Sequence, residues 1–492
     1  MKSGSMKAIE FRAQGVTHKF SVTPLSTVVG LAAPKKAGKA GAARAAAAAF
    51  DVASMVSRLY KMKALKMRLP SASAADIGIV NMPPAGTRLP APRGMRAGVA
   101  RPHSATVMTL VTPSLIVEGA RVADLKAARN KGARILDEGY DGKTLLGVDR
   151  LDELPAILDL LTKRDVGSVT PNFLRRFTRT PLSATATDWA YARIGLARAW
   201  TITKGTPAIR VAVLDEGVDT KHPALKTAVA GERDFIGGKG NSAMPDGNDA
   251  HGTACSGTIV SRRTAAIGMA PKCSLLAARI AMDDGAGHWV FDDFATADAI
   301  DWSWRNGAAV LSNSWGGGAP SDAISRAFGR ARTQGRGGKG SVVCIAAGNN
   351  QGLIDFPGDL PGYVTVGAST PNDERKTRTS SDGESWWGSN FGPTLWLLAP
   401  GVFIHTTDIS GPAGYDAGNY TATFNGTSSA TPHVAAAAAL MLSANPKLSA
   451  SDVRLLLSTT ATPLAGQTAR TNQLGFGRLD VGAAVAAAKA HA

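Results

Sequence analysis

The chain has little cysteine and no long apolar run. Its 492 residues include three cysteines. Three is too few for a disulfide framework, and an odd number cannot pair completely. This usage fits a reducing compartment without establishing one. The longest apolar runs fall well short of the roughly 20 residues that cross a bilayer. No apolar h-region follows the first lysines at the usual distance. We therefore expect neither a transmembrane span nor a secretory signal peptide, and the compartment stays open with the cytoplasm favoured.

Acidic residues are scarce in the first hundred positions. Residues 1–101 hold 17 Lys and Arg against 3 Asp and Glu, whereas residues 102–180 hold 12 against 10 and residues 181–492 hold 26 against 25. The net charge of +17 therefore belongs to an N-terminal arm and not to the rest of the chain.

Residues 1–103 have the composition of an extension. A basic, Ala- and Gly-rich stretch covers 35–44, an amphipathic helix with a basic end is predicted over about 45–69, and a Pro-rich linker covers 82–102. One interpretation is a helix that packs on the chain's own body, and we favour it because charge runs are usually solvated. The alternative is an arm that binds an anionic surface such as membrane headgroups, nucleic acid or an acidic partner.

Residues 104–178 have a different pattern. Strands are predicted over 105–117 and 166–173, helices over 122–131 and 151–164, and two further strands within 133–148. The order β-α-β-β-α-β is that of the split βαβ plait, a small ferredoxin-like α+β domain.

From about residue 185 to 492, short apolar strands alternate with helical segments. This alternation predicts an α/β fold with a doubly wound, mainly parallel sheet. In such sheets the functional site lies outside the carboxyl ends of the strands. Asp215 follows an apolar strand there, as do Ser314 and Asn349.

Three separated motifs carry the chemistry. Ser428 follows Gly-Thr and precedes a run of small apolar helix formers, so its hydroxyl would lie at a helix N-terminus, where unpaired N–H groups can bind an oxyanion. A serine alone is a poor nucleophile and needs a base that is itself oriented. His251 in a His-Gly-Thr setting and Asp215 in Asp-x-Gly are candidates for these two roles.

These motifs, in the order Asp, His, Ser, resemble the subtilisin-like serine peptidases (subtilases), and the resemblance covers about residues 185–492. It implies that Ser428 attacks a peptide carbonyl, that His251 moves the proton and that Asp215 holds the imidazole tautomer. Ser429 is a rival nucleophile, and an N-cap serine or a structural histidine is the non-catalytic alternative. Glu216 stands where the family usually has Ser or Thr, and a second acid there would raise the histidine pKa.

The resemblance implies further site residues. Asn349 matches the oxyanion-hole asparagine. An extended substrate would pair with two segments, which contain Ser314, Trp315 and Gly316 in one and Gly285 and Gly287 in the other. The first specificity pocket would be open and suited to apolar or large side chains, and its lining residues would be Ala346, Ala347 and Gly348. Phe356-Pro357 resembles the family's cis-proline turn near that pocket.

The plait also resembles a family feature, the inhibitor-type propeptide. This implies an intramolecular chaperone and inhibitor whose last segment occupies the active site until it is cut, and the basic stretch 175–180 is the candidate cleavage region. An unrelated ferredoxin-like domain is the alternative.

No cofactor is expected to be required. Ala224 follows His222-Pro223 where many family members have an Asp calcium ligand, so that strong site is expected to be lost, although weaker calcium sites remain open. Cys255, four residues after His251, should lie beneath the imidazole. It could form a zinc pair, resemble the thiol-containing subtilases or be a small buried hydrophobe, and we favour the last.

The sequence thus predicts a serine endopeptidase that acts on protein or peptide substrates and is made as a proenzyme inhibited by its own propeptide. The alternative is a latent or inactive homologue that binds peptides without cutting them. The oligomeric state is not readable from the sequence.

Overall fold

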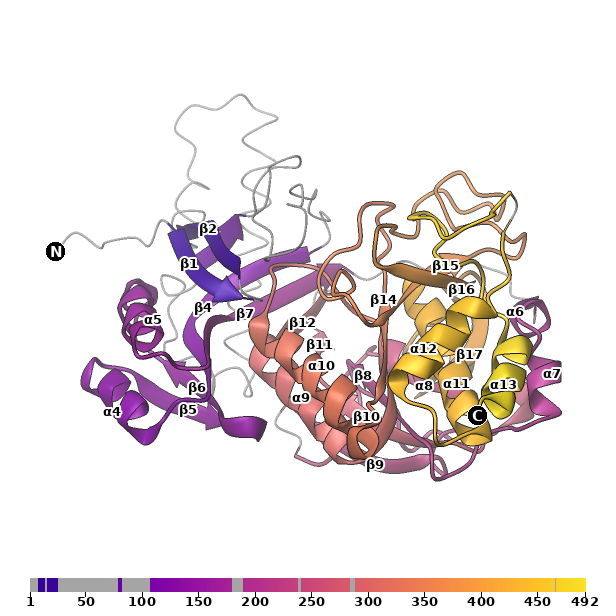
Figure 1. The fold of residues 1–492 in the computed structure, drawn as a ribbon, viewed down its shortest axis with the longest axis horizontal. Helices are drawn as coiled ribbons and strands as arrows, with labels where there is room; N and C mark the ends of the chain where they lie inside the picture. Colours follow the sequence, from indigo (N-terminus) through magenta and orange to yellow (C-terminus); the bar gives the residue numbers. More distant parts are fainter. Residues whose placement is uncertain are drawn as a thin grey trace.

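The computed structural model describes residues 8–13, 16–24, 78–81, 107–178, 189–237, 240–283, 288–464 and 466–492. The helix predicted over 45–69 and the linker at 82–102 lie outside these residues. We call residues 107–178 the plait and the described residues from 189 to 492 the C-terminal body. Figure 1 shows the two lying side by side.

A seven-stranded sheet forms the centre of the C-terminal body. Its strand order is β16-β15-β14-β13-β8-β10-β9, and every neighbouring pair is parallel. The strands are β8 (Arg210–Asp215), β9 (Val229–Asp234), β10 (Ser274–Arg279), β13 (Ala308–Asn313), β14 (Val342–Ala346), β15 (Val364–Ser369) and β16 (Leu395–Pro400). This confirms the doubly wound α/β fold. The chain order reverses at β8, between β10 and β13, so a crevice is expected at the carboxyl end of β8.

Helices cover both faces of this sheet. One face packs on α7 (Leu196–Trp200), α8 (His251–Val260), α11 (Thr427–Ala444) and α13 (Val481–Ala490), and the other on α9 (Asp293–Arg305) and α10 (Asp322–Gln334). Side chains of β8 alternate between the two cores: Val211 and Val213 join the first, and Ala212 and Leu214 join the second. Burial on both faces explains why these strands are continuous apolar runs.

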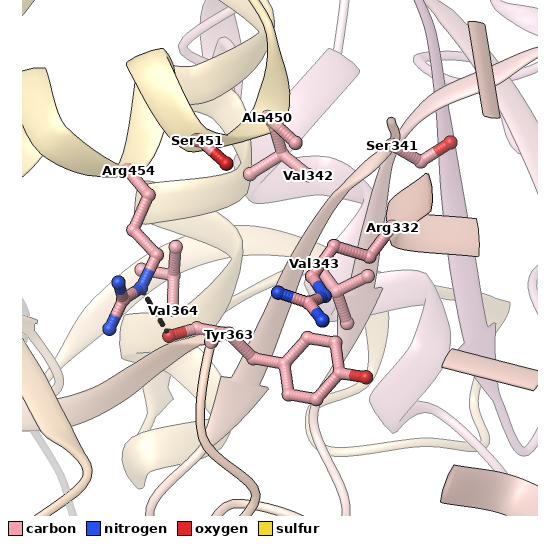
Figure 2. A pocket seen from close by; sticks show the side chains of 10 residues that line it. Arg332, Ser341, Val342, Val343, Tyr363, Val364, Ala450, Ser451 and Arg454 are labelled. Carbon is pink, nitrogen blue, oxygen red and sulfur yellow. Dashed lines mark hydrogen bonds between the residues drawn. The ribbon is translucent and has the colours of Figure 1, made fainter. Parts of the chain in front are cut away.

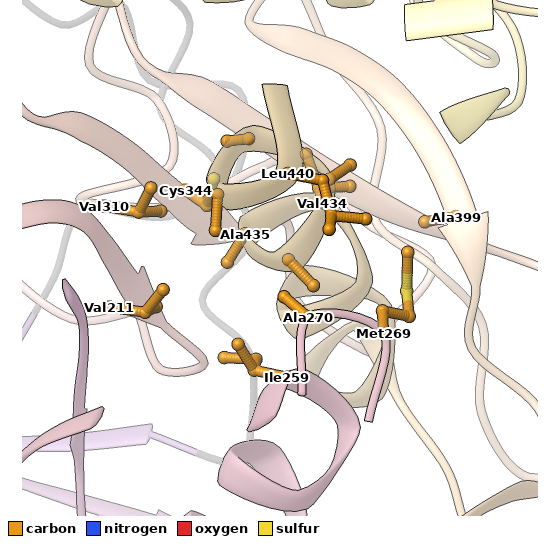
Figure 3. Packing of buried hydrophobic residues seen from close by; sticks show 14 of the residues in the cluster. Val211, Ile259, Met269, Ala270, Val310, Cys344, Ala399, Val434, Ala435 and Leu440 are labelled. Carbon is orange, nitrogen blue, oxygen red and sulfur yellow. The ribbon is translucent and has the colours of Figure 1, made fainter. Parts of the chain in front are cut away.

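Helix α11 is buried on all sides. Its run from 435 to 439 consists of alanines, all fully buried, and the lack of larger side chains lets the helix approach the sheet closely. Val434, Ala435 and Leu440 pack among Val310 and Cys344 of the strands (Figure 3). The helix therefore fixes the position of its own first turn against β13 and β14.

The plait has the element order that the sequence predicted. It consists of β4 (Val107–Glu118), α4 (Val122–Asn130), β5 (Arg134–Glu138), β6 (Lys143–Gly147), α5 (Leu154–Lys163) and β7 (Ser168–Thr178). All strand pairs are antiparallel, with β4 between β6 and β7. Two short 3₁₀ turns, η2 (Tyr140–Gly142) and η3 (Leu151–Glu153), interrupt it, and η3 takes the place of the first turn of the predicted helix over 151–164.

The sheet of the plait continues in both directions. On one side it includes β1 (Ala8–Ala13), β2 (Val16–Pro24) and β3 (Gly78–Asn81), and on the other β12 (His288–Asp292) and β11 (Met282–Asp283) of the C-terminal body. Strands β1 to β3 are not among the elements predicted from the sequence. The alternation of Ile9 with Phe11 and of Phe20 with Val22 was the available signal, since these four side chains are buried in the plait core.

The remaining elements surround the central sheet. They are α6 (Trp189–Arg193), the hairpin of β17 (Ile404–Gly411) and β18 (Gly418–Phe424), α12 (Ala450–Thr459), and the 3₁₀ turns η4 (Thr264–Ala266) and η5 (Gly335–Gly338). The hairpin leads directly into α11. Among the described residues, none of the helices combines the length and apolarity needed to cross a lipid bilayer.

Candidate active site

Three elements bring the predicted chemical groups to the carboxyl edge of the sheet. Asp215 is the last residue of β8, His251 is the first residue of α8, and Ser428 is the second residue of α11. Cys255 connects the last two: its Sγ lies 3.8 Å from Nδ1 of His251 and 3.6 Å from the carbonyl oxygen of Ser428. Residues that are more than 200 positions apart in the sequence therefore share one site.

Asp215 holds the imidazole of His251. Nδ1 of the ring lies 2.9 Å from Oδ1 and 3.0 Å from Oδ2 of the buried carboxylate. A proton on Nδ1 leaves Nε2 as the acceptor, which is the tautomer that a general base needs. Trp289 and Phe424 contact the ring with interplanar angles of 74° and 80°, at centroid distances of 4.4 and 5.4 Å, and so limit its rotation.

Glu216 binds the backbone of the histidine and not its ring. Its Oε1 accepts a 2.7 Å hydrogen bond from the backbone N–H of His251, the first residue of α8. Its own N–H donates to Oδ1 of Asp215 at 2.9 Å, and its carbonyl accepts from Nε of Arg279 at 3.2 Å. The sequence predicts a second acid that acts on the imidazole, but the acid in contact with the ring is Asp215.

The hydroxyl of Ser428 has a backbone partner in this structure. Its Oγ donates to the carbonyl oxygen of Ser314 at 3.3 Å, and Oγ of Ser314 donates in return to the carbonyl oxygen of Ser428 at 2.9 Å. Hydrogen bonds between nucleophile and base are often formed fully only in the substrate complex. Ser314, predicted to pair with substrate, therefore also holds the first turn of α11.

The rival nucleophile, Ser429, points elsewhere. It is fully buried, and its Oγ donates a 2.9 Å hydrogen bond to the carbonyl oxygen of Gly426. Ser428, by contrast, is partly exposed. The geometry therefore favours Ser428 over Ser429 as the reactive hydroxyl.

Asn349 and the start of α11 form a candidate oxyanion hole. Oδ1 of Asn349 accepts from the N–H and the Oγ1 of Thr427 at 2.8 and 2.9 Å, which assigns Nδ2 to the other side of the amide. A Cβ on Gly426 would lie 3.2 Å from that Nδ2 and 3.5 Å from the backbone nitrogen of Ser428. Two N–H donors thus converge beside Gly426, whose φ of +119° also favours glycine.

The structure treats the predicted substrate-binding residues differently. Gly285 and Gly287 lie outside the described residues. Trp315 is buried between Phe291 and Phe328, so its indole belongs to the core and only its backbone could pair with a peptide.

The pocket residues Ala346, Ala347 and Gly348 come at the end of β14, and the N–H of Gly348 donates to Oγ1 of Thr427 at 3.1 Å. The Phe356–Pro357 bond is cis, as predicted. The carbonyl of Phe356 accepts from Gly317 next to the predicted substrate residue Gly316.

A cluster of possible metal ligands lies within this site. The ligand atoms of Asp215, His251 and Cys255 lie within 4.8 Å of one another. Burial raises the pKa of the Cys255 thiol well above its usual value, and the charge of Asp215 adds to this, which disfavours the thiolate that zinc needs. Position 224, where the family often has a calcium-binding Asp, is a fully buried alanine and offers no carboxylate.

A separate cavity lies at the opposite edge of the sheet. It is lined by Arg332, Tyr363 and Arg454 and by the amino ends of β14, β15 and α12 (Figure 2). Nε of Arg454 donates to the carbonyl of Tyr363 at 3.0 Å. Because the triad candidates lie at the carboxyl ends of the strands, this cavity is not part of their site.

The fold and the site together define a subtilisin-like α/β serine hydrolase, and comparison with known proteins agrees. The family model described as the Subtilase family matches residues 206–477. The chain therefore belongs to the subtilase family, and it is a serine endopeptidase.

Individual relatives support this assignment. The chain is 37% identical to subtilisin DY of Bacillus licheniformis over 52% of its own length and 84% of that protein. It is 32% identical to thermitase of Thermoactinomyces vulgaris over 56% of its length and 88% of that protein.

Among solved structures, proteases from Pseudoalteromonas arctica match with a TM-score of 0.51 and 26% identity, covering 60% of this chain and 94% of that one. The serine protease of Aeromonas sobria, solved in complex with a chaperone, matches with a TM-score of 0.50 and 23% identity, covering 58% of this chain and 60% of that one. The second likeness concerns the fold alone.

Proposed function

We propose that Ser428 is the nucleophile of this peptidase, His251 its general base and acid, and Asp215 the group that orients His251. The observation that carries the proposal is the paired contact of Nδ1 with both oxygens of Asp215 at 2.9 and 3.0 Å, at the sheet edge where α11 presents Ser428. Asn349 and the backbone N–H of Ser428 are proposed as the oxyanion donors.

The reaction follows from these positions. Oγ of Ser428 attacks the scissile carbonyl carbon while Nε2 of His251 takes its proton, and the carboxylate of Asp215 stabilises the imidazolium. The carbonyl oxygen becomes an oxyanion held by the two N–H donors. The C–N bond then breaks as His251 protonates the amine, which leaves an acyl-enzyme. Water attacks the ester with His251 again as base, and the carboxylic acid and free Ser428 are restored.

We further propose that the plait is an inhibitory propeptide. Strand β7 pairs antiparallel with β12, and its end is adjacent to the catalytic residues: Phe177 pairs with Trp289, whose ring contacts His251. Residues 179–188 connect this strand to α6. A cut in that connection by the enzyme itself would separate the plait from the C-terminal body.

Charge complementarity supports a specific complex between the two parts. The fully buried Lys143 of the plait pairs with the fully buried Asp301 of α9. Arg330 of α10 lies 2.7 Å from Asp301 and 3.3 Å from Glu118 of the plait, and Arg326 lies 2.9 Å from Glu118. Alternating charges from both parts thus neutralise one another, which gives specificity more surely than net stability.

No cofactor is proposed as a requirement. A relative named calcium-dependent protease, from Nostoc, is 31% identical over 59% of this chain and 47% of that protein. Because Ala224 offers no ligand, we propose that calcium binds weakly, through backbone carbonyls and loop acids, and is not needed for catalysis. Full activity in the presence of EDTA is expected.

Intact-mass analysis of the wild-type protein beside Ser428→Ala tests the proposal. The wild type should lose an N-terminal piece that ends between residues 178 and 189, while the variant stays whole. If both stay whole, a fluorophosphonate probe distinguishes a latent enzyme, which is labelled at Ser428, from an inactive one, which is not. Cleavage of both would assign the cut to another protease or the nucleophile to another residue.

A further inference from the structure

Arg175 of the plait is buried inside the C-terminal body. Its side chain is 1% exposed and that of Asp293 is 0% exposed. Nε donates to Oδ1 of Asp293 at 2.6 Å and Nη2 donates to Oδ2 at 3.0 Å. Nη1 donates to the carbonyl of Gly317 at 2.6 Å and Nη2 to that of Ala319 at 2.7 Å. The guanidinium also lies 5.3 Å from the ring centre of Phe356.

Every group that holds this guanidinium belongs to the C-terminal body. Asp293 is the first residue of α9, directly after β12. Gly317 and Ala319 follow the predicted substrate segment, and Phe356 is in the cis-proline turn. The pocket is therefore complete without the plait, which contributes only its occupant.

The chemistry of the pocket matches arginine and not lysine. A carboxylate that accepts two parallel N–H bonds, two carbonyls and an aromatic face fit a planar guanidinium. A lysine ammonium is a point charge that cannot make the bidentate contact. Burial raises the pKa of Asp293, and the adjacent Arg175 opposes that shift. Departure of Arg175 would remove the counter-charge of this carboxylate, and a substrate arginine would restore it.

We infer that this pocket is a subsite for an arginine side chain on the acyl side of a bound peptide, filled by Arg175 in the precursor and by substrate arginine after the plait leaves. The inference rests on the proposed peptidase function and deepens it, because it names a substrate feature. Arg175 pairs with Phe291 on β12, and the strand then continues towards Trp289 beside His251. For a cut after residue 178, the arginine lies at least four positions before the scissile bond.

Peptides with the chain's own sequence 171–188 test this subsite. Self-processed wild-type protein is given the native peptide, a version with Arg175→Gln and a version with Arg176→Gln, which removes the same charge one residue away. We expect Arg175→Gln to lower kcat/KM by about tenfold or more and Arg176→Gln by less than about threefold. A peptide with Arg175→Lys should fall between them. Equal kcat/KM for the native and Arg175→Gln peptides would overturn the inference.

The enzyme side supplies the second half of a double-mutant cycle. In self-processed Asp293→Asn protein, the difference between the native and Arg175→Gln peptides should shrink to less than about threefold, because the two changes remove the same contact. An undiminished difference would assign the peptide effect to another contact and overturn the pocket.

A separate measurement distinguishes failure of the pocket from failure of the proposed peptidase function. If the wild type neither cleaves these peptides nor reacts with a fluorophosphonate, the peptidase function fails. The pocket is then tested by hydrogen exchange in the full Ser428→Ala chain, with Arg175→Gln compared with Arg134→Gln, a surface arginine paired with Asp149. The protection of the β12 amides from exchange should fall by about tenfold in the Arg175→Gln variant and stay unchanged in the Arg134→Gln variant. Unchanged protection in both would overturn the pocket.

Discussion

The backbone N–H of His251 donates a 2.7 Å hydrogen bond to the carboxylate of Glu216. Glu216 follows Asp215 in the sequence and donates its own N–H to Oδ1 of Asp215. Glu216 therefore connects Asp215, which orients the proposed base, with the first turn of the helix that carries that base. A carboxylate at this position also complements the positive end of the helix dipole.

Replacement of Glu216 by alanine should impair the position of His251. We expect kcat to fall about fivefold, which corresponds to about 1 kcal/mol for a lost helix-capping acceptor, with KM little changed. Glu216→Gln keeps a side-chain oxygen acceptor and should retain most of the activity. Steady-state kinetics of the self-processed variants on a peptide substrate provide the measurement. If Glu216→Gln lowers kcat as much as Glu216→Ala does, the negative charge of Glu216 is required and a neutral hydrogen-bond acceptor is not sufficient.

Replacement of Asn349 by alanine should remove one oxyanion donor. Because Nδ2 of Asn349 and the N–H of Ser428 converge beside Gly426, we expect kcat to fall by about 10²–10³ while KM changes little. The kcat and KM of the variant on one substrate decide this. A loss confined to KM would place Asn349 in ground-state binding and not in the oxyanion hole.

The two adjacent serines should differ completely in reactivity. Ser429 is buried and donates to the carbonyl of Gly426, whereas Ser428 is partly exposed. A fluorophosphonate probe should label the wild type and Ser429→Ala but not Ser428→Ala. Mass spectrometry of the labelled peptide locates the adduct. Labelling that persists in Ser428→Ala and is lost in Ser429→Ala would reverse the assignment.

His433 should make the folded protein less stable in mild acid. It is fully buried in α11, and desolvation lowers its pKa from 6.5 to about 4 although Nδ1 donates to Ser429 at 2.8 Å. The unfolded chain gains this proton near pH 6.5 and the folded chain only near pH 4, so stability falls as the pH drops through that interval. At pH 5 the loss is about 2 kcal/mol.

Urea unfolding of the Ser428→Ala chain at pH 7.5 and pH 5 measures this loss, and the Ser428→Ala background prevents self-digestion. His433→Asn in the same background removes the titrating group, and an Asn amide can donate to Ser429 in place of Nδ1. The pH-dependent change in the free energy of unfolding should be smaller by about 2 kcal/mol in this variant. An identical pH dependence in both chains would show that His433 is not the responsible group.

The three thiols should be unreactive while the chain is folded. Cys255, Cys273 and Cys344 are all buried, and burial is the main cause that raises the pKa of each. We expect Ellman's reagent at pH 8 to titrate no thiol in the native Ser428→Ala chain and three after denaturation in guanidinium. A thiol that reacts rapidly in the native chain would contradict the burial of these residues.

The sequence predicted those parts of the site that topology dictates. Asp215 ends a parallel strand and His251 begins a helix, and both ends meet at one edge of any doubly wound sheet, so their contact followed from element order. The contact of Cys255 with His251 followed from the helical i, i+4 spacing. The cis bond at Phe356–Pro357 followed from the family resemblance.

Other contacts depend on long-range packing that no local pattern carries. The bond from His251 to Glu216 requires a particular side-chain conformation across the strand–helix gap. The Arg175 pocket draws on three segments that are 118 to 181 residues away from it. Strands β1 and β2 did show alternating apolar residues, but their basic, small-residue surroundings favoured an extension. The motif that contains Trp315 predicts a contact with substrate, whereas its indole fills the core.

The sheet that runs from the plait into β12 gives the proposed cut a particular outcome. Hydrolysis between residues 178 and 189 would break one covalent bond and none of the pairings of residues 174–178 with residues 288–292. The plait would no longer be covalently linked to the C-terminal body, so its effective concentration at the active site would fall. Dilution alone would then activate the enzyme. Freshly cut protein at high concentration would remain inhibited by the bound fragment. The specific activity of the same sample would rise once its concentration fell below the dissociation constant of the fragment.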